Sequence, residues 1–153
     1  LTGCRMSEIL TLEWDCVDDG YLHLPHTKTG PQRRPISPQA QDLIASIERV
    51  DGNPYVIRGK LPGTHLVEVK KAWQRVRGRA GLKEVRLHDL RHTFASVAVS
   101  NGMPLRMVGE LLGHRDVQTT NRYAHLADSA VREAAKAIGA GLSAAIEEPS
   151  VSK

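Results

Sequence analysis

Residues 88–102 read HDLRHTFASVAVSNG and decide how the second half of the chain is interpreted. The apolar residues Leu90, Phe94, Val97 and Ala98 recur at helical spacing, and the final Asn-Gly pair commonly ends a helix. This stretch therefore predicts an amphipathic helix that opens at His88. A three-residue step places His88 and Arg91 on one helix face, where a guanidinium can hold two phosphate oxygens and an imidazole can exchange a proton.

Other amphipathic segments are predicted on both sides of this helix by the same spacing and by residues that cap or end helices. They cover residues 7–12, 38–50, 66–80, 104–112, 117–124 and 129–146. Two extended runs, at residues 21–24 and 33–37, flank a polar turn and predict a β-hairpin with Lys28 at its tip. We therefore expect a mainly α domain with a small antiparallel β-sheet (α+β), over residues 1–146, and a disordered tail at 147–153.

The charge of the chain favours an anionic partner. The net charge is +4 and the isoelectric point is about 9.3, and residues 70–91 carry eight Lys and Arg against two acids. A solvated basic helix face explains this segment as well as a nucleic-acid contact does. Because aromatic residues make up 4% of the chain, stacking on single strands is disfavoured and contact with a duplex backbone is favoured.

Composition also limits cofactors and location. Cys4 and Cys16 are the only cysteines, which is too few for a disulfide framework or a four-thiolate metal site. No apolar run approaches membrane-spanning length, so we expect no membrane contact and a cytoplasmic setting. His88 and His92, four residues apart with an acid between them, imitate the paired histidines of zinc hydrolases. We interpret this match as coincidental, because Arg91 lies in the same turn and spacing suggests no third ligand.

Two further residues become candidates only in combination with the others. His114 follows a glycine that ends a predicted helix, and Tyr123 lies nine residues later. Either side chain alone is more simply explained as packing, because a tyrosine on a short helix is usually a half-buried anchor.

Five blocks in order resemble the signature of the tyrosine recombinase family. They are residues 2–8 (TGCRMSE), 27–30 (TKTG), 88–92 (HDLRH), 112–114 (LGH) and 123–125 (YAH). The resemblance implies a catalytic domain in which six residues act on a scissile phosphate: Arg5, Lys28, His88, Arg91, His114 and Tyr123. Glu8 would orient Arg5, although a surface salt bridge is an equal explanation. Cys4 occupies a position at which members of this family more often have an aliphatic residue.

The resemblance implies site-specific recombination of DNA, in which Tyr123 attacks the phosphate and forms a 3′-phosphotyrosine link. His88 is the expected base and Lys28 the expected acid. The link preserves the bond energy, so no cofactor is expected, and paired arginines can stabilise the developing charge without a metal.

The family further implies double-stranded DNA as partner, a homotetramer on paired sites, and a nucleoid-associated protein. Its members carry more chain before the first arginine, so the domain is expected to be incomplete at its N-terminus. Two alternatives stay open: a type IB topoisomerase, and a non-catalytic helix-turn-helix module around Gly102 and Pro104.

Overall fold

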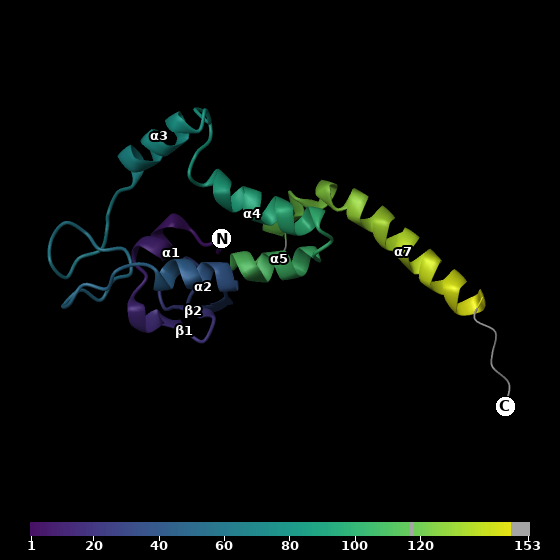
Figure 1. Ribbon diagram of the computed structural model, residues 1–153, viewed down its shortest axis with the longest axis horizontal. Coiled ribbons are helices and arrows are strands. Elements are labelled where there is room, and N and C mark those ends of the chain that lie inside the picture. Colours follow the sequence, from purple (N-terminus) through teal and green to yellow (C-terminus); the bar gives the residue numbers. More distant parts are fainter. Residues whose placement is uncertain (117, 148–153) are drawn as a thin grey trace.

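The computed structural model describes residues 1–116 and 118–147 (Figure 1). The elements in chain order are α1 (Met6–Leu10), η1 (Trp14–Cys16), β1 (Val17–Asp18), β2 (Tyr21–Leu24), β3 (Gln32–Pro35), α2 (Pro38–Ala45), α3 (Lys70–Arg79), α4 (Asp89–Ser100), α5 (Leu105–Leu112), α6 (Gln118–Asn121), η2 (Ala124–Leu126) and α7 (Asp128–Glu147). The expected class, mainly α with a small antiparallel sheet, is confirmed.

The sheet contains the predicted hairpin and one more strand. Its order is β1-β2-β3, and both pairs are antiparallel, with Leu22 opposite Arg34. The short strand β1 was not predicted, since two residues give no periodic pattern. It turns into β2 through Asp19 and Gly20, which both have positive φ angles of 41° and 76°. Leu22 and Leu24 are buried, so the alternation of β2 points one face of the sheet into the core.

Two hydrophobic clusters share the interior of the described chain. The cluster around the sheet contains Leu12, Trp14, Leu22, Leu24, Ile36, Ala40 and Val56. The helical cluster contains Ala95, Val99, Val108, Leu112 and Tyr123. Figure 1 shows the corresponding halves, with α1, α2 and the sheet at one end and α4 and α5 beside them. The polar residues between these clusters make up the candidate site.

The buried face of α4 differs from the predicted one. Arg91, Ala95 and Val99, which are four residues apart, face the interior. Leu90 and Val97, predicted to be core residues, are 50% and 55% exposed. The prediction followed the apolar residues alone; it was wrong for Leu90 and Val97, whereas Phe94 and Ala98 are partly buried against the helical cluster. Arg91 faces inward because two buried carbonyl groups accept its hydrogen bonds, and Ala95 is small enough for close contact between elements.

Two predicted helices are shorter than their apolar patterns. The helix predicted at residues 38–50 ends at Ala45, where Ser46 caps it. The helix predicted at residues 66–80 begins at Lys70, because the backbone of Leu66 pairs with Ile57 instead. Long connections on both sides set α3 apart in Figure 1. Hydrogen bonds from Trp73 and Arg77 to the carbonyl oxygen of Val85 hold the helix.

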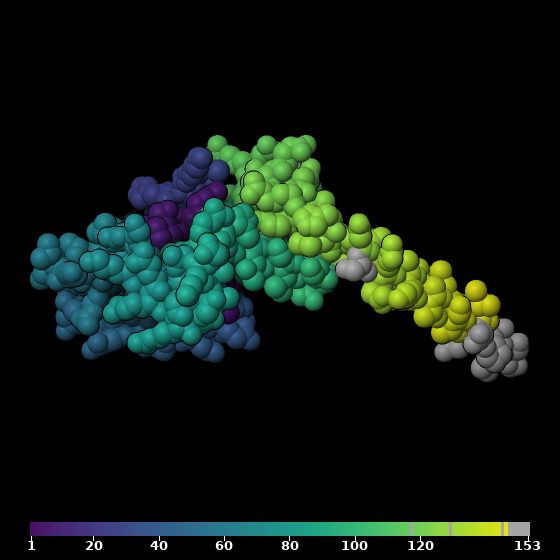
Figure 2. All heavy atoms as spheres, turned by 90° about the horizontal axis from the view of Figure 1, so that it is seen from above, coloured from purple at the N-terminus to yellow at the C-terminus, as the bar shows by residue number. Residues whose placement is uncertain are grey.

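Helix α7 leads away from the remainder of the described chain in Figures 1 and 2. Its first turns contact α4 and η2. Its apolar side chains farther along are exposed, including Ile138 at 63% and Leu142 at 61%. The tail predicted at residues 147–153 begins with Glu147, which still belongs to α7, and residues 148–153 lie outside the described residues. Within the described ranges, no helix has the length and apolar character needed to cross a bilayer.

Candidate active site

Arg5 is fixed at the start of α1 by the carboxylate of Glu8. The backbone nitrogen of Arg5 donates to Glu8 Oε2 at 2.7 Å, and Arg5 Nη1 donates to Oε1 at 2.8 Å. Glu8 is buried, so this pair is not the surface salt bridge that the sequence left open. Burial raises the pKa of Glu8, but hydrogen bonds from Arg34 and Arg5 outweigh it and hold the pKa below its ordinary value.

Arg34 is a second buried partner of Glu8 that the sequence analysis missed. Its Nη1 and Nη2 donate to the two carboxylate oxygens at 2.8 and 3.1 Å, and its Nε donates to Gln32 Oε1 at 2.9 Å. The hairpin register contains the signal that could have found it. Residues directly opposite on neighbouring strands face the same side, and Arg34 stands opposite the buried Leu22.

Arg91 joins the beginning of the chain to the end of α5. Its Nη1 donates to the carbonyl oxygen of Gly3 and its Nη2 to that of Leu112, both at 2.6 Å. Gly3 has a φ of 63°, and a Cβ there would lie 2.7 Å from the ring of Phe94, so glycine is required. Burial, followed by the charges of Arg5 and Arg34, lowers the pKa of Arg91 to about 10. Arg91 therefore stays cationic at neutral pH.

His114 reaches the same centre through the left-handed end of α5. Gly113 has a φ of 68°, and a Cβ there would collide with the side chains of Gln32 and Arg34. Nδ1 of His114 lies 2.9 Å from Thr120 Oγ1. Burial, together with the charge of Arg91 and other nearby arginines, lowers the pKa of His114 to about 4. The imidazole is therefore neutral at pH 7, and its other nitrogen can donate a hydrogen bond.

Tyr123 is buried between α6 and η2, where its ring belongs to the helical cluster. Its hydroxyl lies 2.5 Å from Nδ1 of His92. Burial raises the pKa of Tyr123, although the charges of Arg122 and Arg91 oppose that rise. His88 was the base expected from the family resemblance, but the imidazole on the hydroxyl is that of His92. His88 instead packs edge-on against His92, with ring centroids 5.1 Å apart.

Lys28 makes no contact with this centre through the hydrogen bonds and ion pairs of the described residues. It is exposed in the turn between β2 and β3, which a hydrogen bond from Thr27 Oγ1 to the carbonyl oxygen of Gly30 closes at 2.6 Å. Lys28 enters none of the hydrogen bonds or ion pairs found among the described residues. The fold thus gathers Arg5, Arg91 and His114 closely, with Tyr123 and His88 beside them. Lys28 remains at the end of its hairpin.

A comparison with known families decides the relationship. A family model described as the phage integrase family matches residues 1–130. The chain belongs to the phage integrase family. Two curated relatives illustrate the match. Tyrosine recombinase XerD of Lacticaseibacillus casei is 34% identical over 140 residues, which are 83% of this chain and 47% of XerD. The integrase of Salmonella phage P22 is 30% identical over 168 aligned positions, covering 99% of this chain and 43% of that integrase.

Solved structures agree with this membership. XerA recombinase matches with a TM-score of 0.65 at 26% identity, covering 86% of this chain and 52% of XerA. The catalytic domain of bacteriophage HP1 integrase matches with a TM-score of 0.64 at 29% identity, covering 88% of this chain and 74% of that domain. This phage integrase chain therefore has the tyrosine recombinase catalytic-domain fold. It spans about half the length of the curated relatives named above.

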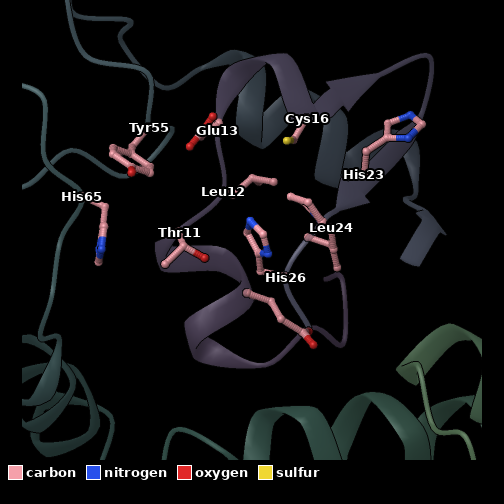
Figure 3. A pocket seen from close by; sticks show the side chains of 11 residues that line it. Thr11, Leu12, Glu13, Cys16, His23, Leu24, His26, Tyr55 and His65 are labelled. Carbon is pink, nitrogen blue, oxygen red and sulfur yellow. The ribbon is translucent and has the colours of Figure 1, made fainter. Parts of the chain in front are cut away.

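Two hollows of this phage integrase chain border the arginine centre: Glu8 lines the first, and His88 and Arg91 line the second. One, of about 270 Å³, lies behind Glu8, and Figure 3 shows His26 and His65 among its lining side chains. The other is an apolar groove of about 650 Å³ between α1, α3 and α4. Over the part of the chain that the structure describes, no three His, Cys, Asp or Glu residues cluster in a way that suits a metal ion.

Proposed function

We propose that the chain cleaves and rejoins double-stranded DNA in site-specific recombination, through a 3′-phosphotyrosine intermediate on Tyr123. The observation that carries this proposal is the gathering of Arg5, Arg91 and neutral His114 beside a buried tyrosine hydroxyl. Arg5 and Arg34 share the carboxylate of Glu8, so positive charge remains in excess at this point. A phosphate group is the natural partner for such a surplus of preorganised donors.

The arginines hold the phosphate in this mechanism. Arg91 is fixed by two backbone carbonyls and retains further N–H groups, which bind one non-bridging oxygen. Arg5, held by Glu8 and 26% exposed at its side chain, binds the other. His114 donates from its free nitrogen, and His88 completes the cradle at the start of α4. These groups are in place before reaction, so little reorganisation opposes the developing charge.

The chemical step exchanges one phosphate ester for another. The oxygen of Tyr123 forms a bond to phosphorus while the bond from phosphorus to the 5′ oxygen breaks. The phenolic proton passes to an imidazole of α4, and the 5′ oxygen takes a proton from Lys28. The reverse step rejoins the strand. A covalent adduct between Tyr123 and the 3′ side of a nicked duplex is the product that tests the proposal.

The two alternative functions can be distinguished from recombination by the DNA products that they leave. A type IB topoisomerase relaxes supercoiled plasmid and leaves paired sites unexchanged, whereas a recombinase exchanges the flanks of two sites. A pure helix-turn-helix module forms no covalent adduct at all. Membership of the phage integrase family supports recombination over both. An enzyme of this kind acts where its DNA lies, so we place it in the cytoplasm with the nucleoid.

Helix α3 is the proposed contact to the DNA backbone. It is basic along its length, none of its side chains is buried, and it ends with Arg77 and Arg79. Neutralising Arg75 and Arg79 together, as glutamines, should lower the slope of log affinity against log salt by about 2, because each lost phosphate contact removes about 0.9. Sequence preference should stay unchanged. Fluorescence anisotropy with a labelled duplex between low and moderate salt measures the slope.

A matched double variant on α7 controls for the loss of net charge. Arg132→Gln with Lys136→Gln also removes two positive charges from exposed positions and should leave the slope nearly unchanged. If both double variants behave alike, or if the α3 variant keeps the original slope, then α3 is a solvated face.

Helix α7 supports assembly on paired sites as a homotetramer. Its exposed apolar side chains, among them Val131, Ile138 and Leu142, have no partner within the described part of the chain beyond its first turns. Truncation after Ala135, which keeps the first turns of α7 that contact α4 and η2, should abolish the tetrameric complex on DNA and change the free energy of unfolding of the monomer by little. Analytical ultracentrifugation with and without DNA, together with thermal unfolding, measures both effects.

The same truncation also tests whether α7 packs on its own domain instead of on a neighbouring protomer. If α7 packs on its own domain, the truncated chain will assemble normally on DNA and its unfolding temperature will fall. A milder variant, Ile138→Ser with Leu142→Ser, keeps the helix and removes only the apolar stripe. It should reproduce the loss of assembly, whereas Lys136→Gln on the polar side should not.

A further inference from the structure

The hydroxyl of Tyr123 has a specific partner that none of the six candidate residues supplies. Nδ1 of His92 lies 2.5 Å from that hydroxyl, and the two rings are 6.0 Å apart between centroids. His92 comes directly after Arg91 on α4. Successive helical residues point in directions about 100° apart, so the two side chains reach the site from the same turn on different sides. Arg91 faces the phosphate position, and His92 faces the nucleophile.

The surroundings of His92 favour its neutral form. Burial is the largest cause that lowers its pKa below the ordinary value of 6.5, and His88 and Arg122 add to the effect. Arg86 acts in the same direction and Asp89 opposes it. These groups come from α4, from the turn before it and from the segment after α6. A neutral imidazole has one nitrogen with a free lone pair, which can accept a proton.

We propose that His92 is a catalytic residue of the recombination reaction, namely the base that accepts the phenolic proton of Tyr123. This inference rests on the proposed function. As the tyrosine oxygen bonds to phosphorus, its proton moves to Nδ1 of His92 and leaves an imidazolium. When the 5′ hydroxyl later attacks the phosphotyrosine, the imidazolium returns that proton to the departing phenolate. The proton is thus conserved over one cycle.

The geometry separates His92 from His88. His88 lies edge-on to the ring of His92, at an interplanar angle of 89°, and lines the groove beside Thr2 and Gly3. After the proton has left, the charges of Arg122 and Arg91 favour the phenolate form of Tyr123. His92 therefore accepts the proton and the nearby guanidiniums stabilise the anion.

The kinetic test uses single-turnover cleavage of a nicked duplex by the chain and by His92→Ala. We expect His92→Ala to lower the cleavage rate about 100-fold, as for loss of general-base catalysis, with DNA affinity unchanged. A 5′-bridging sulfur substrate, whose leaving group needs no proton, should rescue Lys28→Ala and leave His92→Ala slow. Added imidazole should restore part of the His92→Ala rate. The matched control is His125→Ala, two residues after Tyr123, which should cleave normally.

The pH profile gives a second kinetic readout. The cleavage rate of the unaltered chain should rise as pH rises through the pKa of His92, which lies below 6.5, because only the neutral imidazole accepts a proton. This limb should disappear in His92→Ala. His92→Asn keeps a polar group near Nδ1 that accepts hydrogen bonds but does not take up a proton. If His92→Asn cleaves at the original rate, or if imidazole rescues only a His88→Ala variant, the proposal is overturned.

A measurement on the free protein separates this inference from the proposed function. In ¹⁵N-histidine spectra, Nδ1 of His92 should carry no proton, and its shift should change in Tyr123→Phe, while the shifts of His125 should not. A protonated Nδ1 at neutral pH would overturn the proposal, because that nitrogen then has no lone pair to offer. If the chain forms no adduct on any substrate, the recombination function fails first, and these spectra still decide whether the contact exists.

Discussion

Tyr123→Phe is expected to abolish the covalent protein–DNA adduct. The substitution removes only the hydroxyl, and the ring keeps its place in the helical cluster beside Val108 and Leu112. Folding and DNA affinity should therefore change little, since the lost hydrogen bond to His92 is worth on the order of 1 kcal/mol. The measurement is a denaturing gel with a nicked substrate whose short 5′ fragment diffuses away, so that the adduct accumulates as a slow band.

Two other tyrosines provide the matched controls. Tyr21→Phe and Tyr55→Phe should both form the adduct at the original rate, because their rings lie at β2 and beside His65 rather than at the arginine centre. An adduct that survives Tyr123→Phe and is lost in either control would assign the nucleophile elsewhere.

The conditions of this assay cover the remaining alternatives. Because the chain spans about half the length of its relatives, the assay also uses the chain joined to the part of L. casei XerD that it does not match. The reaction is run in excess chelator. An activity that vanished there and returned with zinc would support the hydrolase interpretation of His88 and His92.

Arg91→Ala is expected to lower the cleavage rate by about 1,000-fold or more and to destabilise the fold. The catalytic loss follows from removing a preorganised cation next to the phosphate, since a single lost donor already costs roughly 100- to 1,000-fold. The structural loss arises because the carbonyls of Gly3 and Leu112 would lose their donor inside the protein. Each unpaired group costs about 1–3 kcal/mol. Single-turnover cleavage and chemical unfolding measure the two effects separately.

Arg91→Lys separates charge from geometry. Lysine keeps the cation but lacks the fork that holds two carbonyls and a phosphate together, so it should recover part of the stability and little of the rate. Arg33→Ala is the matched control, because this exposed neighbour of Arg34 stacks on Tyr21 outside the centre. Near-normal cleavage by Arg91→Ala, at a temperature where it is folded, would remove Arg91 from the mechanism.

The two strands of the hairpin, β2 and β3, and most of the helices were predictable because the sequence signals for them are local. Ser37 accepts a hydrogen bond from the backbone of Ala40 at the start of α2, and Gly113, the glycine predicted to end a helix before His114, ends α5 in a left-handed conformation. Helical and strand periods, caps and turns involve residues a few positions apart, so the sequence alone contains them. The same holds for the five signature blocks, whose order and residue types identified the family before any geometry was available.

Long-range contacts decided the rest. Which face of α4 is buried depends on the carbonyls of Gly3 and Leu112, which are 88 and 21 residues from Arg91. Arg34 belongs to the candidate site because it donates hydrogen bonds in the interior to Glu8, which is 26 residues away. The sequence by itself determined most of the elements, the family and the chemical types of the candidate site residues. Only the tertiary structure decided that His92 meets Tyr123, because hydrogen bonds and desolvation act through distances in space that residue spacing does not contain.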